Sequence, residues 1–364
     1  MTAHLRPVAA FVTMAMLCLP AHAGPAAYPR SYQAIVDASK RESGLLVYSS
    51  MAKYNWAAAI AGFKRRYPWV KVTTLDLGPN ELSERYNAEA AVKRPTADLI
   101  VFAAPDAWQQ LARRGAILPY ASPEAPSLPA WSKPMPGLYT YATAPMLIVY
   151  NKALLRPHQY PTSMAQLAAI AQADPARFRN RLTTYDASSH SFAYAIHWRV
   201  AQQGQQGWNL FRKLGPLTRT EPSGATMLDK VTTGEYLVSY YNSAVTVLPH
   251  MKDVGRDRLV GWTLPTDGTP VMIYGMAVTT AGRSRNSAKL MLDYLLSREG
   301  QILSARGGMT PYRRDVDMRD VPFLTLAEVH RRSGGKLLAV GYDPRMLTGR
   351  EAFISRWNAL FKHR

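Results

Sequence analysis

Small, hydroxyl-bearing residues recur in this sequence at the points where predicted strands end. Ser49 and Ser50, for example, follow the apolar, β-prone run 45–48. Open parallel sheets bind ligands beyond the carboxyl ends of their strands, where helix N-termini offer free backbone N–H groups. Hydroxyl and amide side chains there donate hydrogen bonds without placing a charge in the site. We therefore predict a ligand-binding site formed by Ser49, Ser50, Ala104, Thr143, Asp186, Ser188, Ser189, Ser223, Tyr240, Tyr241, Asn242 and Ser243.

Residue patterns typical of enzymes are missing from the sequence. Asp186, Ser188 and His190 lie close together, but catalytic triads are assembled from distant parts of a chain. There is no Gly-x-Ser-x-Gly, no His-Glu-x-x-His and no P-loop, and the 8 histidines show no metal-ligand spacing. We predict a binding protein rather than an enzyme, with no cofactor and no metal.

The composition indicates a globular protein with anionic partners. Hydrophobic residues make up 47% of the chain and charged residues 19%, which favours a packed core over disorder. Lys and Arg total 44 against 25 for Asp and Glu, a formal charge of +19. An excess of this size attracts anions. The basic residues are scattered in pairs such as Arg65-Arg66, so we expect no nucleic-acid partner and a monomer that binds a small solute.

The N-terminus predicts export. Arg6 precedes the apolar stretch 8–19, and Ala21-His22-Ala23 fits a small-x-small cleavage site. We predict a signal peptide over residues 1–23 and a periplasmic mature protein. Its removal takes away one Arg and no acid, which leaves a charge of 19 − 1 = +18. Cys18 is the only cysteine, so we expect no disulfide and no thiol ligand in the mature chain.

Strands and helices alternate along the first third of the chain. Trp56, Ile60, Phe63 and Tyr67 follow the spacing of one helix face between two short apolar runs. This alternation predicts an α/β fold with helices covering a largely parallel sheet. Predicted strands cover 45–48, 70–75, 98–102, 146–150, 237–241 and 271–278, and predicted helices cover 33–43, 56–67, 81–92, 105–114, 162–173, 192–202, 287–297 and 352–361.

Several of these segments resemble one known family. The run from Ala38 to Ser50 is similar to the opening of ABC-transporter solute-binding proteins of the ferric-ion and organophosphate type. The resemblance extends over nearly the whole mature chain. Residues 353–360 resemble the tail of a subgroup that contains the phosphoglycerate-transport regulatory protein. The other motifs of the resemblance are Glu81-Leu82 with Arg85 and Glu89, 95–99, 115–119, Val149 to Lys152, Gly234-Glu235 with Asn242-Ser243, and 292–297 with Gly300-Gln301.

This resemblance implies a two-lobed periplasmic binding protein fold of class II. Each lobe holds a mixed sheet flanked by helices, and crossing strands near 140–144 and 261–265 join the lobes, which close on solute like a hinge. We expect one lobe to combine residues 30–141 with 262–364 and the other to span 142–261. The implied partner is an ABC permease, or alternatively a membrane sensor histidine kinase.

The ligand is predicted to be a small anion. Hydroxyls, amides and helix N-termini suit an organophosphate or a carboxylate, on which Tyr54, Tyr141, Tyr185 and Tyr240 are available to stack. Ferric iron is the alternative. However, Tyr240-Tyr241 lies about four positions before the family's ligand tyrosines, where this chain has Ala244 and Val245. Adjacent residues of a strand also face opposite sides of the sheet, so Tyr240 and Tyr241 would not ordinarily bind one ligand together.

Overall fold

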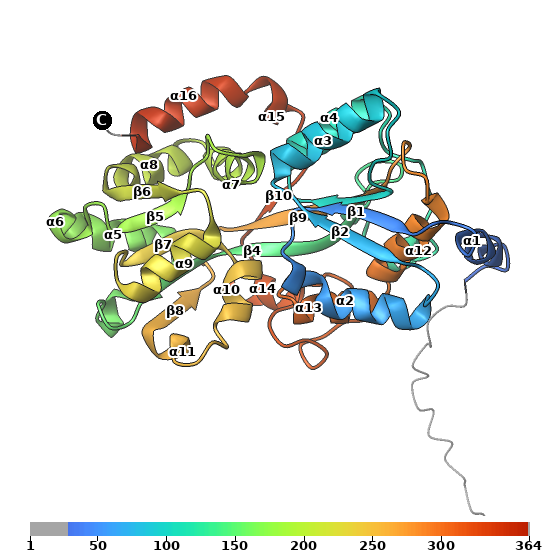
Figure 1. The fold of residues 1–364 in the computed structure, drawn as a ribbon. Helices are drawn as coiled ribbons and strands as arrows, with labels where there is room; N and C mark the ends of the chain where they lie inside the picture. Colours follow the sequence, from blue (N-terminus) through green and yellow to red (C-terminus); the bar gives the residue numbers. More distant parts are fainter. Residues whose placement is uncertain (1–27, 363–364) are drawn as a thin grey trace, which may run out of the picture.

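The computed structural model describes residues 28–362, so the predicted signal peptide lies outside the described range. In this range ten strands form a continuous sheet in the order β2-β1-β3-β9-β4-β7-β5-β6, with β10 beside β9 and β8 beside β4 (Figure 1). None of the helices between residues 28 and 362 combines the length and hydropathy that a membrane crossing requires.

The strands are β1 (Leu45–Ser49), β2 (Val72–Asp76), β3 (Leu99–Phe102), β4 (Tyr139–Asn151), β5 (Leu182–Tyr185), β6 (Thr218–Glu221), β7 (Val238–Ser243), β8 (Val260–Thr263), β9 (Thr269–Val278) and β10 (Leu337–Val340). The helices are α1 (Tyr32–Ser39), α2 (Lys53–Arg66), α3 (Pro79–Ala91), α4 (Pro105–Arg113), α5 (Met164–Ala173), α6 (Pro175–Phe178), α7 (Ser191–Ala201), α8 (Gln205–Leu214), α9 (Gly224–Thr233), α10 (Ala244–His250), α11 (Arg256–Leu259), α12 (Arg285–Leu296), α13 (Arg298–Arg306), α14 (Leu326–Arg332), α15 (Arg345–Thr348) and α16 (Arg350–Phe361).

Helices cover both faces of the first half of the sheet. β1 pairs in parallel with β2 and β3, and all four residues of β3 are buried. Neighbouring strand residues face opposite sides. Accordingly, Val101 shares a buried cluster with Trp56 of α2, whereas Phe102 packs 4.6 Å from Trp108 of α4, ring centre to ring centre. The apolar, β-prone runs therefore form central strands that both helical layers protect.

Strand β4 belongs to both halves of the sheet. Its residues 139–145 pair antiparallel with β9, and its residues 146–151 pair antiparallel with β7 and β8. The change of partner falls at Pro145, which has no backbone N–H to donate to a ladder. The chain returns through β8, residues 264–268 and β9. Two antiparallel strands thus carry the chain between the halves.

The second half of the sheet is built around β5, which pairs in parallel with β6 and β7. Val149 of β4 shares a buried cluster with Leu228 of α9 and Leu248 of α10 on one face. On the other face lie α7 and α8, and the final helix α16 packs against α8 and β6 (Figure 1). The predicted α/β class, with mixed sheets flanked by helices and joined by crossing strands, is confirmed. The predicted lobe boundaries stay a prediction.

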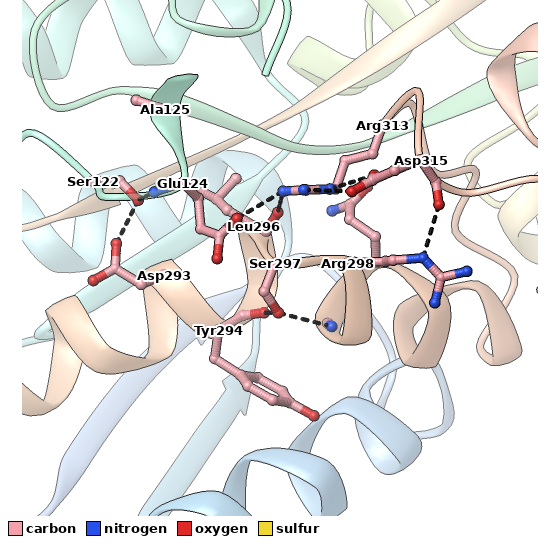
Figure 2. Close-up of polar contacts among 12 residues, drawn as sticks. Ser122, Glu124, Ala125, Asp293, Tyr294, Leu296, Ser297, Arg298, Arg313 and Asp315 are labelled. Carbon is pink, nitrogen blue, oxygen red and sulfur yellow. Dashed lines mark hydrogen bonds and ion pairs between the residues drawn. The ribbon is translucent and has the colours of Figure 1, made fainter. Parts of the chain in front are cut away.

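A buried carboxylate links three segments of the first half. Asp293 of α12 accepts hydrogen bonds from the hydroxyls of Tyr32 at 2.9 Å, Tyr120 at 2.6 Å and Ser122 at 2.5 Å. Figure 2 shows Ser122 directed at this carboxylate. Burial raises the pKa of Asp293 to about 7, although the three hydroxyl donors lower it. Desolvation therefore outweighs the hydrogen bonds.

A buried guanidinium lies near the C-terminal end of α12 (Figure 2). Arg313 donates to Glu124 Oε2 at 2.8 Å, to the Leu296 carbonyl at 2.9 Å and to both carboxylate oxygens of Asp315 at 2.8 Å. Only 5% of its side chain is exposed. Bidentate pairing of this kind fixes geometry as well as charge. The segment after α13 is thereby tied both to the end of α12 and to the loop that precedes β4.

We predict that Asp293→Asn flattens the pH dependence of stability. A carboxyl whose folded-state pKa lies above its unfolded value stabilises the fold fully below the unfolded value, and this contribution is lost as pH rises through the folded pKa. For Asp293 the loss falls between about pH 4 and pH 7 and is on the order of 4 kcal/mol. Urea unfolding at pH 5 and pH 8 measures the difference.

Asp37→Asn is the matched control for this experiment, because Asp37 lies on the exposed face of α1. We expect the control to keep the pH slope of the native protein. An equal slope in native protein and Asp293→Asn contradicts the prediction.

Candidate ligand-binding site

Four tyrosine rings gather where the two halves of the sheet meet. Tyr141 lies on β4 and Tyr274 on β9, Tyr185 ends β5, and Tyr54 lies in the first turn of α2. Burial raises the pKa of Tyr274, and the neighbouring phenols of Tyr185, Tyr54 and Tyr141 raise it further. We call these four residues the tyrosine cluster. Because phenols in this setting keep their protons at neutral pH, they act as hydrogen-bond donors.

The exposure of the cluster falls from its rim to its floor. Tyr54 is 45% exposed and meets the ring of His250 edge-on at 5.5 Å, so the first half of the sheet contacts α10 of the second half here. Tyr274 is 6% exposed, and Tyr141 is fully buried and stacks on Trp56 at 5.6 Å. The cluster therefore extends from solvent into the junction between the lobes.

Asn242 and Ser243 complete one side of the cluster. The Tyr185 hydroxyl lies 3.5 Å from Asn242 Oδ1, and Asn242 Nδ2 donates to the Gly224 carbonyl at 3.1 Å and to Ser239 Oγ at 3.2 Å. Ser243 ends β7 and is 3% exposed, and its Oγ has no hydrogen-bond partner within residues 28–362. A buried, unpaired hydroxyl is costly unless something binds it.

The predicted ligand-binding residues of the first half differ in burial and in whether their side chains already have hydrogen-bond partners. Ser49 is fully buried, and its Oγ accepts from the Met51 amide at 2.9 Å and from Trp56 Nε1 at 3.0 Å. Ser50 is partly exposed at the end of β1, and Ala104 is buried as the residue before α4. Ser49 thus orients α2, while Ser50 keeps its side chain available.

The run from Asp186 to Ser189 forms a turn before α7. Asp186 Oδ1 accepts from the Ser188 amide at 2.8 Å and from the Ser188 hydroxyl at 2.6 Å, and Ser189 Oγ donates to the Asp186 carbonyl at 2.7 Å. Lys362 also donates to Ser188 Oγ at 2.7 Å. These groups already have partners in the structure. Ser223 in turn caps α9, where its Oγ accepts from the amides of residues 225 and 226.

The remaining predicted residues are engaged elsewhere. Thr143 Oγ1 donates to the Thr310 carbonyl at 2.9 Å, and the Tyr240 hydroxyl lies 3.0 Å from Thr218 Oγ1. Tyr241 is a β-bulge, because Leu147 pairs with Asn242 while Ile148 pairs with Tyr240. Its φ of 58° turns it toward a cavity of about 380 Å³ beside α5 and α8. The structure does not bring Tyr240 or Tyr241 into the tyrosine cluster.

Sequence reasoning missed Tyr274 and a set of contacts at the mouth of the site. Tyr274 stands in the middle of the strand predicted over 271–278, which was a usable signal. Ser191 at the start of α7 lies 3.2 Å from Asn80 Oδ1 and 3.1 Å from Asp106 Oδ2, both in the first half. Arg350 Nη1 lies 2.8 Å from the same oxygen of Asp106. These contacts connect α3 and α4 of the first half with α7 and α16 on the second.

The arrangement presents hydrogen-bonding groups to a bound molecule. The tyrosine cluster, Asn242 and Ser243 present hydroxyl and amide groups, and no group of three or more His, Cys, Asp or Glu suited to a metal occurs between residues 28 and 362. His197 lies deep under α16 and α8, fully buried, and burial lowers its pKa to about 4. It therefore stays neutral and packs among aromatic rings.

Comparison with known proteins agrees with this geometry. The sequence pattern of the bacterial extracellular solute-binding proteins matches residues 48–302, which is more than half of the chain. The chain belongs to this family. Members of this family are substrate-binding transport proteins rather than enzymes; they bind small solutes and typically work with ABC permeases. No curated protein matches the chain in sequence.

Solved structures share the fold at low sequence identity. The substrate-binding protein of an ABC transporter from Agrobacterium tumefaciens has a TM-score of 0.79 at 22% identity, covering 88% of this chain and 95% of its own. AfuA from Actinobacillus pleuropneumoniae, with fructose-6-phosphate bound, gives 0.65 at 18%, and iron-bound HitA from Pseudomonas aeruginosa gives 0.69 at 15%; each covers 88% of this chain and 99% of its own. The two-lobed binding-protein fold is confirmed.

We predict that Gly224→Ala perturbs the site from outside the tyrosine cluster. A Cβ at Gly224 would lie 2.4 Å from the Tyr185 hydroxyl and 2.6 Å from Asn242 Oδ1, so both side chains must move. Overpacking of this kind lowers the free energy of unfolding by about 1–3 kcal/mol. Urea denaturation measures the change.

Gly78→Ala is the control, since its Cβ would come no closer than 4.0 Å to Glu81 Oε2 at the start of α3. We expect a change below about 1 kcal/mol there. Equal losses at the two glycines would show that Tyr185 and Asn242 are not held against Gly224.

Proposed function

We propose that this solute-binding protein captures a small organic anion, an organophosphate or a carboxylate, between its two lobes. The lobes comprise residues 30–141 with 262–364 and residues 142–261, except that the end of the first range, residues 343–362, packs on α8 and β6 of the second lobe. The bound solute is delivered to an ABC importer. Export by the predicted signal peptide over residues 1–23 places this step in the periplasm. The unpaired hydroxyl of Ser243 beside the tyrosine cluster is the observation that carries the proposal.

The chemistry of the cluster favours an acceptor-rich ligand. Burial raises the pKa of Tyr185 and Tyr274, so both phenols stay protonated and donate. Ser243 Oγ is buried and free to donate to a ligand oxygen. Phosphate and carboxylate oxygens accept such bonds, and hydrogen bonds to a charged acceptor are the stronger ones. The rings of Tyr54 and Tyr185 supply apolar surface for the organic part of the solute.

Two electrostatic features favour an anionic ligand: the helix N-termini at the site and the net charge of the chain. The helices α4 and α7 both start at the lobe junction, and helix N-termini carry positive partial charge worth about 0.3–1 kcal/mol per favourable contact. After removal of the predicted signal peptide the chain has a formal charge of 19 − 1 = +18, which raises the local concentration of anions. Sugar phosphate also occurs in this fold, since AfuA was solved with fructose-6-phosphate.

Ferric iron is the second candidate, because four tyrosines meet at the junction and HitA was solved with iron. Iron binding by phenols requires phenolates. Burial opposes that ionisation, since it raises the pKa of Tyr54 as well as that of Tyr274. A carboxylate or histidine set would lower this barrier, and the described residues contain no such group of three. The protonated cluster therefore favours the organic anion.

The identity of the solute is tested by native mass spectrometry of protein purified from the periplasm, followed by calorimetric titration. The panel consists of phosphorylated sugars, phosphoglycerates and carboxylates, with ferric citrate as the rival. Heat with at least one organic anion and none with ferric citrate is expected. Heat with ferric citrate alone overturns the proposal. Neighbouring genes for a permease and an ATPase, as against a histidine kinase, separate transport from sensing.

Two substitutions localise the site. Ser243→Ala and Tyr274→Phe each remove one hydroxyl, and each is expected to weaken binding of the active panel compound about tenfold, as the loss of a hydrogen bond to a charged group does. Tyr240→Phe is the control. It removes a phenol that bonds to Thr218 in the core, so stability falls while affinity holds. Unchanged affinity in both site variants would show that the ligand binds away from the tyrosine cluster.

A further inference from the structure

The end of the chain lies across both lobes. Residues 343–362, which we call the C-terminal clasp, include α15 and α16 and run along the face formed by α7 and α8 (Figure 1). The first part of this segment, which contains α15, lies beside α4 of the first lobe (Figure 1). It is therefore positioned to connect α4 with α7.

Aromatic packing fixes the clasp to the second lobe. Phe353, Trp357 and Phe361 are all less than 7% exposed. Trp357 stacks on Phe361 at 4.3 Å, and Phe361 meets Phe211 of α8 edge-on at 5.7 Å. Buried aromatic surface of this extent dominates local packing energy. The clasp thus moves with the second lobe as one body.

Polar contacts join the clasp to the first lobe. Arg350 Nη1 donates to Asp106 Oδ2 at 2.8 Å, and Gln109 Nε2 of α4 donates to the Asp343 carbonyl at 3.1 Å. The guanidinium of Arg350 also lies 4.5 Å from the ring centre of Tyr194 on α7. Arg350 is therefore held by the second lobe while its charge pairs with the first.

The Asp106 carboxylate is buried between α4 and groups on the second lobe. Its side chain is 4% exposed, against 34% for Arg350, and it also accepts from Ser191 Oγ of α7 at 3.1 Å. Ser191 belongs to the second lobe, and Arg350 is held against that lobe through the clasp. Separation of α4 from α7 would break both contacts at once and return the carboxylate to water.

We propose that the C-terminal clasp holds the lobes closed through Arg350 and Asp106, and so sets how readily the cleft opens. The inference extends the proposed function to its regulation, because the closed state is the one that retains solute. The pair lies at the mouth and not in the tyrosine cluster. A closed population accordingly exists before any solute binds, and a solute adds to it.

The test measures the distance between the lobes without any solute. The mature chain has no cysteine of its own, because Cys18 lies in the predicted signal peptide. Glu84→Cys on α3 and Gln205→Cys on α8 therefore place two exposed label sites on opposite lobes. Pulsed electron resonance on spin labels at these sites gives the distance distribution. The native background is expected to show a short-distance population. In Arg350→Gln and in Asp106→Asn that population falls about tenfold relative to the longer one, as for loss of a partly buried pair.

Arg345→Gln is the matched control, because Arg345 pairs with Asp343 inside the clasp and leaves the lobe contact intact. It is expected to give the native distribution. Asp106→Arg combined with Arg350→Asp is expected to restore part of the short-distance population, which a folding defect would not allow. Identical distance distributions in native, Arg350→Gln and Asp106→Asn proteins would contradict the proposal that the clasp holds the lobes closed. Since no solute is used, that result leaves the proposed function standing.

Discussion

The antiparallel ladder between β4 and β9 is the constraint on which the rest of the molecule depends. Residues 139–145 of β4 bond to residues 271–276 of β9, and β4 then continues as a strand of the second sheet. One backbone therefore sets the position of both lobes. It also places Tyr141 and Tyr274 at the junction, because each sits on one of the two bonded strands. The site is located by main-chain hydrogen bonds before any side chain contributes.

Burial at this junction imposes a second condition, which is the satisfaction of hydroxyl groups. Most buried hydroxyls near the site have partners, as Ser49 does with Trp56 and Asn242 with Gly224. Ser243 Oγ and Tyr141 Oη do not have partners within residues 28–362. Proteins rarely leave such groups unpaired without a reason. Unpaired buried polar atoms also occur away from the junction, as at Thr96 and His197. What ties Ser243 and Tyr141 to the site is therefore their position at the tyrosine cluster, not the lack of a partner alone.

The elements that the sequence predicts well are those with a clear apolar pattern. α2, β3 and α4 lie within a few residues of their predicted ranges, since the two helices each have an apolar face and β3 is a continuous apolar run. β4 is different. The sequence predicts it only from Met146 to Tyr150, whereas the strand begins at Tyr139. Its first half contains Thr, Ala and Pro145, and pairing with β9 compensates for their weak pattern. β6 is also missed, because Thr-Arg-Thr-Glu at a sheet edge carries no apolar signal.

In the site, too, the sequence predicts which residues lie near the cleft but not which contacts they make with distant parts of the chain. Tyr54, Tyr141 and Tyr185 are expected near the cleft because each lies close in sequence to predicted ligand-binding residues. Ser188 is expected there too, yet its hydroxyl bonds to Asp186, only two residues away. Local spacing brings a serine to a strand end but does not reveal whether a neighbour already binds its hydroxyl. The pairing of Asp106 with Arg350, which are 244 residues apart, leaves no trace in the sequence pattern.

Closure of the lobes combines these two kinds of contact. A solute shifts the balance between open and closed lobes only by the difference in its affinity for the two states. In the proposed site the tyrosine cluster and Ser243 would provide that difference, because Tyr54 comes from one lobe while Tyr185 and Ser243 come from the other. In the proposed clasp the Arg350–Asp106 pair would act on the same balance without touching the solute. On this proposal, affinity depends on residues at the end of the chain as well as on the residues of the cleft.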